Sequence, residues 1–175
     1  DRMSRLIGDM LSLANADNKS WSIMKTDCEL DTLLLDTYEK YQPILHWKKI
    51  SLKVVLPEEP LSICKCDSAR ISQVLGILLD NGASYVSAGG RMEMGVKENE
   101  KYFQLYVQDN GPGIPDENKE AVFRRFYRAD PARKEKQHFG LGLCIAREIV
   151  TLHKGSIRIL DTPGGGSTFV IRLPK

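Results

Sequence analysis

The chain has 175 residues with 42% hydrophobic and 27% charged side chains, which is typical of one folded domain with a proper core. Its formal net charge of +2 does not favour nucleic acid or a membrane surface as a partner. No apolar run reaches the roughly 18 residues that a membrane-spanning helix needs. The cysteines lack the spacing of a metal or redox motif, so reduced, buried thiols of a cytosolic protein are favoured at Cys28, Cys64, Cys66 and Cys144.

The first part of the chain is expected to be a helix cut from something longer. Apolar residues recur at helical spacing from Met3 to Ala14, and the polar run 15–20 then indicates a linker. The chain begins at Asp1 in the middle of this pattern, so we expect it to be a piece of a larger protein. The apolar face needs a partner, and packing on its own domain or in a dimeric bundle both remain open.

The rest of the chain predicts an α+β domain. Asp67 suits the N-cap of a long helix, and the segment 115–139 is charged with no strand pattern. Because the strands cluster late and their connections are short, we expect a two-layer sandwich with helices on one face of a mixed, mainly antiparallel sheet. The sequence shows neither a Rossmann alternation nor a P-loop. Strands are predicted at 21–24, 50–55, 61–66, 91–97, 101–108, 156–160 and 168–173, and helices at 30–45, 67–85 and 141–153.

The most informative motif is Asp109 followed by the glycine turn 110–113. A carboxylate at the end of a buried strand is costly unless a donor satisfies it, and the exocyclic amine of adenine is such a donor. Guanine carries an acceptor oxygen at the same place and would be rejected. Gly111 and Gly113 allow the backbone to approach a ring closely. The alternative is an ordinary hairpin turn.

Two residues of the helix 67–85 are further candidates for a nucleotide site. Asn81 lies near the apolar face, where an asparagine is unfavourable without a local reason, and its amide oxygen suits Mg²⁺ that bridges phosphates. Tyr85 follows one turn later and could lay its ring against a base. A capped or solvated asparagine beside Gly82 is the simpler alternative.

Two later segments could hold phosphates. The turn 140–142 opens a helix, and helix N-termini present free N–H groups to anions, although glycines before a helix are also common for structural reasons. The stretch 122–136 mixes Phe123, Phe126 and Tyr127 with arginines and lysines. It is either a solvated loop or a lid, anchored by the aromatic rings, that brings arginines near a γ-phosphate.

Taken in order, these segments resemble the ATP-binding domain of bacterial sensor histidine kinases, within the superfamily of gyrase, chaperone and mismatch-repair ATPases. The similarity runs from about Trp21 to Pro174. Five motifs in the family's order make the resemblance specific. They are 67–81 for the N box, 109–115 for the G1 box, 122–128 for the F box, 140–146 for the G2 box and 164–169 for the last glycine turn.

The resemblance implies a Bergerat-type fold and transfer of the γ-phosphoryl group of ATP to a histidine. It implies that Asn81 binds Mg²⁺ and that Asp109 binds the adenine amine. Further ATP contacts are implied for Tyr85, Gly111, Gly113, Ile114, Arg124, Arg128, Gly140, Leu141, Gly142, Leu143 and Thr168. Residues 1–18 resemble the end of the second helix of the dimerisation and phosphoacceptor domain plus a linker, and 19–175 the catalytic domain.

The same resemblance implies partners and a location. The domain would meet its own dimerisation and phosphoacceptor domain and a response regulator receiver domain. The parent protein would be a homodimer anchored in the bacterial plasma membrane, with this domain in the cytoplasm. The sequence identifies neither the stimulus nor the response regulator.

Three positions depart from the family pattern. Ile77 replaces a polar residue four positions before Asn81, Ser84 replaces a lysine, and His138 replaces the first glycine of the fuller G2 pattern. We expect nucleotide binding weaker than in a typical member. Ile77 disfavours a hydrolytic ATPase, which would need a glutamate there, whereas a degenerate domain that only binds partners stays open.

The phosphoacceptor histidine is expected upstream of this chain. None of its histidines lies in an acceptor-like motif, and we expect His46 and His153 to be surface or helix-end residues. The chain alone should therefore bind ATP without phosphorylating itself.

Overall fold

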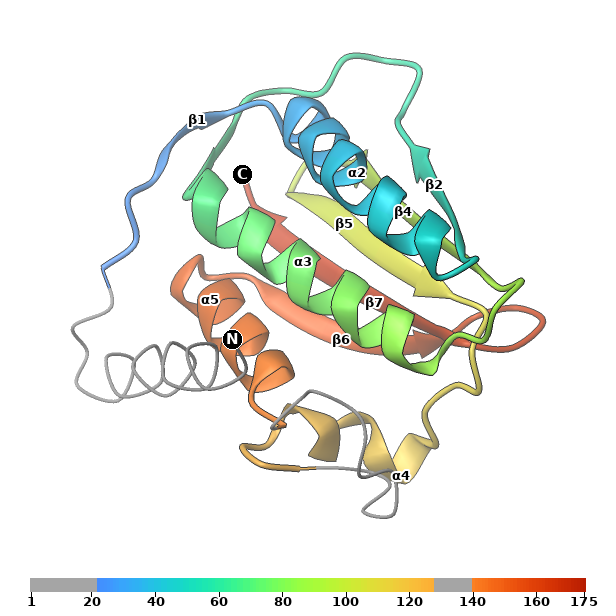
Figure 1. Ribbon diagram of the computed structural model, residues 1–175. Helices are drawn as coiled ribbons and strands as arrows, with labels where there is room; N and C mark the ends of the chain where they lie inside the picture. The colour runs from blue at the N-terminus through green and yellow to red at the C-terminus, as the bar shows by residue number, and fades with distance from the viewer. Residues whose placement is uncertain (1–21, 128–139) are drawn as a thin grey trace.

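The computed structural model describes residues 22–127 and 140–175. One layer is a five-stranded sheet and the other consists of long helices that cover one of its faces (Figure 1). The strands of the sheet are β2 (Ser51–Val55), β4 (Arg91–Glu98), β5 (Tyr102–Asp109), β6 (Ser156–Asp161) and β7 (Ser167–Pro174). The covering helices are α2 (Leu30–Trp47), α3 (Ser68–Tyr85) and α5 (Gly142–Leu152).

The strand order is β2-β4-β5-β7-β6. The β2–β4 pair is parallel, and every other pair in this sheet is antiparallel. The predicted α+β sandwich with a mixed, mainly antiparallel sheet is therefore confirmed. No helix of the described ranges is long and apolar enough to cross a membrane.

The central strand β5 sets the position of the carboxylate that the sequence singles out. Side chains alternate between the two faces of a strand, and in β5 the buried positions are Phe103, Leu105, Val107 and Asp109. Asp109 therefore points to the same face of the sheet as these three core side chains, which is the face that the helices cover. It is the last residue of the strand.

Helix α3 begins as predicted. The Asp67 carboxylate accepts a hydrogen bond from the backbone N–H of Arg70 at 3.1 Å, which makes it the N-cap. The apolar face of the helix then packs on the sheet through Ile71, Val74, Leu75, Leu78 and Leu79, all essentially inaccessible to solvent. Burial of this stripe, rather than helix propensity, holds α3 in place.

Two of the predicted strands need correction. The strand expected at 21–24 is absent from the described residues 22–24, and the strand in this region is β1 (Thr26–Cys28). It pairs with β3 (Cys64–Cys66), a shortened form of the strand predicted at 61–66, in a separate two-stranded ribbon. The described part of 115–139 contains the short helix α4 (Asp116–Lys119) and a 3-10 turn at Ala121–Phe123. Both are too short to produce a periodic signal.

His153 follows α5 as expected for a helix-end residue, but it is not on the surface. It is 2% exposed. Its Nε2 accepts a hydrogen bond from the backbone N–H of Asp67 at 3.0 Å, and its Nδ1 lies 2.8 Å from the carbonyl oxygen of Ile149. Because that carbonyl can only accept, Nδ1 carries the proton and the ring is neutral. This imidazole joins the end of α5 to the start of α3.

Replacing His153 by leucine should destabilise the domain by about 1–3 kcal/mol, because the buried Asp67 N–H loses its acceptor and the Ile149 carbonyl loses one of its two donors. His46→Leu is the matched control, since His46 is exposed and its loss should change stability by about 0.5 kcal/mol at most. Urea denaturation of both variants measures the difference. Equal free energies of unfolding for the two variants would show that the His153 hydrogen bonds do not stabilise the domain.

Candidate nucleotide site

The centre of the candidate site is the carboxylate of Asp109, which is 7% exposed. Its Oδ1 accepts hydrogen bonds from the backbone N–H groups of Gly111 at 2.8 Å and Ser167 at 3.4 Å. Burial raises the pKa of this carboxyl group, and the two backbone N–H groups act in the opposite direction. Among the described residues none donates a hydrogen bond to Oδ2, so the carboxylate keeps an acceptor for an external donor.

The two glycine turns pack directly on each other at this carboxylate. Gly166 has φ +108°, and a Cβ there would lie 1.9 Å from the backbone oxygen of Asp109. Gly113 has φ +77°, and its Cβ would lie 3.4 Å from the backbone oxygen of Gly166. Positive φ favours glycine at both positions, and at Gly166 the close approach also excludes any side chain. The turn before β7 is therefore part of the same site as the turn after β5.

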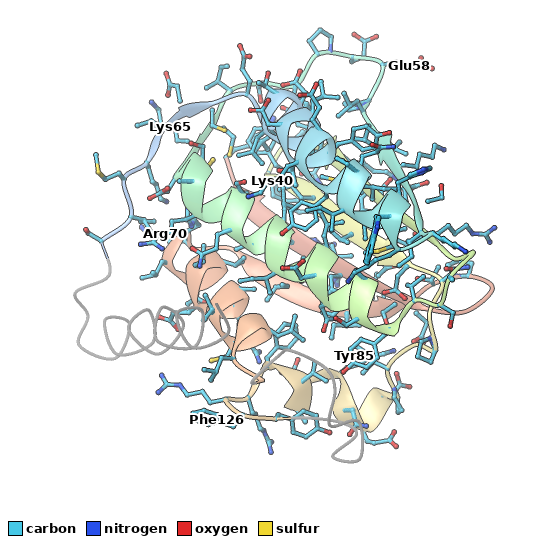
Figure 2. The ribbon with its side chains drawn as sticks, in the orientation of Figure 1. Lys40, Glu58, Lys65, Arg70, Tyr85 and Phe126 are labelled. Carbon is cyan, nitrogen blue, oxygen red and sulfur yellow. The ribbon has the colours of Figure 1, made fainter. Side chains whose placement is uncertain are left out.

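The C-terminal end of α3 completes this side of the site. A Cβ on Gly82 would lie 3.8 Å from the Cβ of Asp109, and one on Gly111 would lie 3.7 Å from the carbonyl carbon of Tyr85. Figure 2 shows Tyr85 at this end of the helix, and its side chain is 40% exposed. Asn81 lies one turn earlier, so the two side chains share a helix face. Asn81 is half-buried and its amide forms no hydrogen bond with any residue of the described ranges.

The start of α5 lies against the same helix. Gly140 has φ +75°, and its carbonyl oxygen accepts a hydrogen bond from the N–H of Phe126 at 3.0 Å. Leu141 is buried, and a Cβ on Gly142 would lie 3.2 Å from Cγ2 of Ile77, one turn before Asn81. The free N–H groups that begin α5 are therefore placed beside the Asn81 region of α3.

The described part of the F-box segment is anchored by one ring. Phe123 is buried and meets Phe169 edge-to-face at 6.5 Å, with the guanidinium of Arg147 over its ring at 5.0 Å. Phe126, expected to be a second anchor, is instead 63% exposed, as Figure 2 shows at the rim of the molecule. The Tyr127 hydroxyl donates to Oδ1 of Asn118 at 2.8 Å.

The structure places most of the sequence-predicted residues at one end of the molecule, where α4, the end of α3 and the start of α5 lie (Figure 1). Ile114 and Leu143 are half-buried and pack on the core, and Arg124 is exposed. Thr168 pairs with Gln108 across β5 and β7, and its hydroxyl lies 2.9 Å from that of Thr162. Arg128 and His138 lie outside the described residues, as does the helix expected within 1–18.

Sequence reasoning missed the contribution of Ser167. Its backbone N–H donates to Asp109 across a separation of 58 residues, and its side chain is 4% exposed. The only signal is that Ser167 directly follows the glycine turn 164–166. Neither a backbone donor nor its distant acceptor can be identified from local patterns.

The donor set fits Mg²⁺ held mainly by phosphates. In the described ranges, no group of three or more histidine, cysteine, aspartate or glutamate side chains could hold a metal ion. Mg²⁺ commonly binds one or two protein oxygens and completes its shell with phosphates and water. The half-buried amide of Asn81, which has no hydrogen-bond partner in the described part of the chain, could supply one such oxygen.

Comparison with known families identifies the class of this domain. The family described as histidine kinase-, DNA gyrase B-, and HSP90-like ATPase matches residues 66–175. The chain belongs to this family, and the resemblance drawn from the five motifs is confirmed.

Known relatives agree with this assignment. Sensor protein SrrB of Staphylococcus aureus is 35% identical over 175 residues, which are 99% of this chain and 30% of the relative. The chain thus spans about 30% of the length of the curated relatives it matches. Among solved structures, the nucleotide-free catalytic domain of the histidine kinase ThkA is 26% identical, with a TM-score of 0.76 over 87% of this chain and 96% of that one. The Acinetobacter baumannii histidine kinase AdeS is 25% identical, with a TM-score of 0.78 over 98% and 77%.

Gly166→Ala and Gly164→Ala form a matched pair that tests the contact between the turns. Both glycines have positive φ, so both variants should lose roughly 1–2 kcal/mol of stability from backbone strain. A Cβ on Gly164 meets nothing within 4 Å, whereas one on Gly166 collides with the Asp109 backbone. Thermal denaturation should therefore show a clearly larger loss for Gly166→Ala. Equal losses would mean that the turns do not pack as described.

Proposed function

We propose that this chain is the ATP-binding kinase domain of a two-component sensor histidine kinase. It binds ATP with Mg²⁺ and transfers the γ-phosphoryl group to a histidine on the dimerisation and phosphoacceptor domain, for relay to an aspartate of a response regulator. Family membership and the similarity to sensor protein SrrB support this proposal. The observation that carries it is the buried carboxylate of Asp109 with one oxygen left to accept a donor.

Asp109 would select adenine through its unused oxygen. The exocyclic amine of adenine donates to Oδ2, while the carbonyl oxygen of guanine would set an acceptor against a buried acceptor. Tyr85 and Ile114 would form walls of the base pocket, and Gly111 and Gly113 would let the backbone lie close to the ring. ShkA, which shares this fold at 22% identity, has been solved in complex with the adenine nucleotide AMPPNP.

The phosphates would lie between α3 and the start of α5. Free N–H groups there would come from the backbone of Gly140, Leu141, Gly142 and Leu143. Gly142 lies next to Ile77, and Asn81 follows Ile77 by one turn of α3, so Asn81 would lie beside the same phosphates. Bound Mg²⁺ would neutralise phosphate charge. Arg124, Arg128 and Thr168 complete the proposed set of ATP contacts. Catalysis would then come mainly from positioning and charge neutralisation.

The departures from the family pattern have physical consequences in this site. Ser84 carries no charge, and its hydroxyl donates to the carbonyl oxygen of Asp80 at 2.9 Å, one turn back on the same helix. Ile77 is half-buried against the core and next to Gly142, and its hydrocarbon side chain cannot activate water. We therefore expect weak ATP binding and little hydrolysis.

The wider assembly is also a proposal. The parent protein would be a membrane-anchored homodimer with this domain in the cytoplasm. Residues 1–18 would be the end of the second helix of its dimerisation domain plus a linker. The complex of ThkA with the response regulator TrrA is a precedent for the partner class among proteins of this fold, at 24% identity.

Asp109→Asn should weaken ATP binding by about 10- to 100-fold, since hydrogen bonds to charged groups contribute roughly 1.5–3 kcal/mol. The asparagine preserves the shape of the carboxylate but replaces one acceptor by a donor. Calorimetric titration of Mg-ATP and Mg-GTP into both proteins measures the effect, and wild type should prefer ATP. Equal affinity of wild type for ATP and GTP would contradict adenine selection by Asp109.

Phosphoryl transfer should depend on an acceptor supplied from outside. With γ-labelled ATP and the separately produced dimerisation and phosphoacceptor domain of the parent protein, acid-labile label should appear on that domain and not on this chain. Asn81→Ala should abolish the transfer while thermal stability stays near that of wild type, because its amide has no described partner to lose.

The same assay separates the alternatives. Release of inorganic phosphate without any acceptor would identify a hydrolytic ATPase. ATP binding without transfer or hydrolysis would identify a domain that only binds partners, and either outcome would overturn the proposed kinase function.

Ser84→Lys should tighten ATP binding several-fold, since it restores a positive charge beside the phosphates. A lysine and a phosphate about 4 Å apart gain roughly 1 kcal/mol in water and more near a protein surface. Ser84→Gln is the neutral control of comparable length. Titrations at low and high salt should show the gain for lysine alone, and it should shrink as salt rises.

A further inference from the structure

A cluster of three thiols lies outside the candidate nucleotide site. Cys28 on β1 and Cys64 and Cys66 on β3 are 8%, 1% and 0% exposed, and all three are free thiols. Figure 1 shows the β1–β3 ribbon near the N-terminal end of α3, away from the end that carries Asn81 and Tyr85. No part of the proposed ATP chemistry uses these thiols.

The register of the ribbon decides which thiols can join. Cys28 lies directly opposite Cys64, and opposed residues of an antiparallel pair have Cα atoms about 4.5–5.5 Å apart, within the range of disulfides. Cys28 and Cys66 are diagonal neighbours at roughly 7–8 Å, which is too far without backbone movement. Cys64 and Cys66 follow each other on one strand about 6.6 Å apart, at the edge of the range.

Two contacts outside the thiol face are compatible with this register. On the opposite face of the ribbon, Nζ of Lys65 lies 2.6 Å from Oδ1 of Asp27, the residue directly across from it. Beyond the ribbon, the N–H of Met24 donates to Oδ2 of Asp67 at 3.0 Å. A slip by one residue would turn the thiols outward and break the ion pair. The opposition of Cys28 and Cys64 is therefore specified and not accidental.

One member of the pair lines a cavity. Cys28 lines a cavity of about 540 Å³ between the ribbon and the starts of α2 and α3. The charged residues that line it are all acidic, namely Asp27, Glu29 and Asp36. A disulfide reagent that enters this cavity meets Cys28 first, and the negative charges favour a cationic reagent over an anionic one.

We propose that Cys28 and Cys64 form a reversible disulfide by exchange with small, preferably cationic disulfides that enter this cavity. The Cys28 thiolate attacks one sulfur of the reagent and releases the first thiol, which leaves a mixed disulfide on Cys28. The Cys64 thiolate then attacks Sγ of Cys28 and releases the second thiol. Two protein thiols and one reagent disulfide become one protein disulfide and two reagent thiols, so two electrons pass to the reagent.

The surroundings of the thiols affect these two steps differently. Burial raises the pKa of Cys28, so the thiolate that makes the first attack is scarce and this step should be the slower one. Hydrogen bonding with the Cys66 thiol lowers the pKa of Cys64, with a smaller contribution from Lys25, and so favours the thiolate that performs the second step. Cys66 keeps its own proton, since the hydrogen bond with Cys64 and burial both raise its pKa. Cys66 is thus a positioning residue and not a disulfide partner.

Cystamine, bis(2-hydroxyethyl) disulfide and glutathione disulfide test the proposal as cationic, neutral and anionic probes. Each is incubated with the Cys144→Ser chain, which keeps the ribbon and removes the fourth cysteine. Peptide mapping by mass spectrometry after alkylation should find a Cys28–Cys64 disulfide, formed fastest with cystamine and slowest with glutathione disulfide. High salt should narrow that difference. The oxidised chain should melt at a higher temperature than the reduced one.

Variants in the same background separate the steps. Cys64→Ser should stop at the mixed disulfide on Cys28, Cys28→Ser should form no disulfide at the ribbon, and Cys66→Ala should slow the second step. A Cys28–Cys66 or Cys64–Cys66 bond, or no bond under any of the three reagents, would overturn the proposal. The Asp109→Asn variant should form the Cys28–Cys64 disulfide at the same rate as the parent chain. The outcome of this test is therefore independent of whether the proposed ATP function is correct.

Discussion

The structure depends on a single buried carboxylate. Asp109 occupies a core-facing position of β5, where an unpaired charge would cost several kcal/mol. Two backbone N–H groups satisfy one of its oxygens, one from the turn that follows β5 and one from the start of β7. Both turns must therefore come to the same point, and Gly166 is the position where that approach leaves no room for a side chain. The pairing of β5 with β7 brings the second turn there.

Helix α3 connects this carboxylate to the rest of the domain. Its first turn is fastened to α5 through the neutral ring of His153, and its last turn lies against Asp109 through Gly82. Between the two ends, Ile77 meets the first residue of α5. A displacement of α3 would therefore change the geometry of both the base-selecting end and the phosphate-binding end of the proposed site. The rigid, fully apolar face of the helix resists such a displacement.

The sequence predicted the parts of this molecule that depend on local patterns. Apolar periodicity located α2, α3 and α5, the Asp67 cap marked the start of α3, and the two long strands around 99 were recognised as a hairpin. Contacts between distant residues were not predictable in this way. The burial of His153, the donor at Ser167 and the pairing of β1 with β3 each join residues separated by tens of positions. The short helix α4 was not predicted for a different reason, because four residues are too few to show the helical repeat of apolar residues. The motifs located the candidate site, but its hydrogen bonds required the fold.

The departures at Ile77 and Ser84 fall on one side of the proposed site. In the proposed binding mode, the adenine side would retain its buried carboxylate, its glycine turns and Tyr85, whereas the phosphate side would have an apolar side chain and a neutral hydroxyl on α3. Interactions with the base are the same in the ground state and the transition state, so they contribute affinity without accelerating transfer. Charge near the γ-phosphate acts mainly on the transition state. On the proposed function, the substitutions should therefore reduce the rate of phosphoryl transfer more than they reduce ATP affinity. The domain would then remain selective for ATP even where it transfers phosphate slowly.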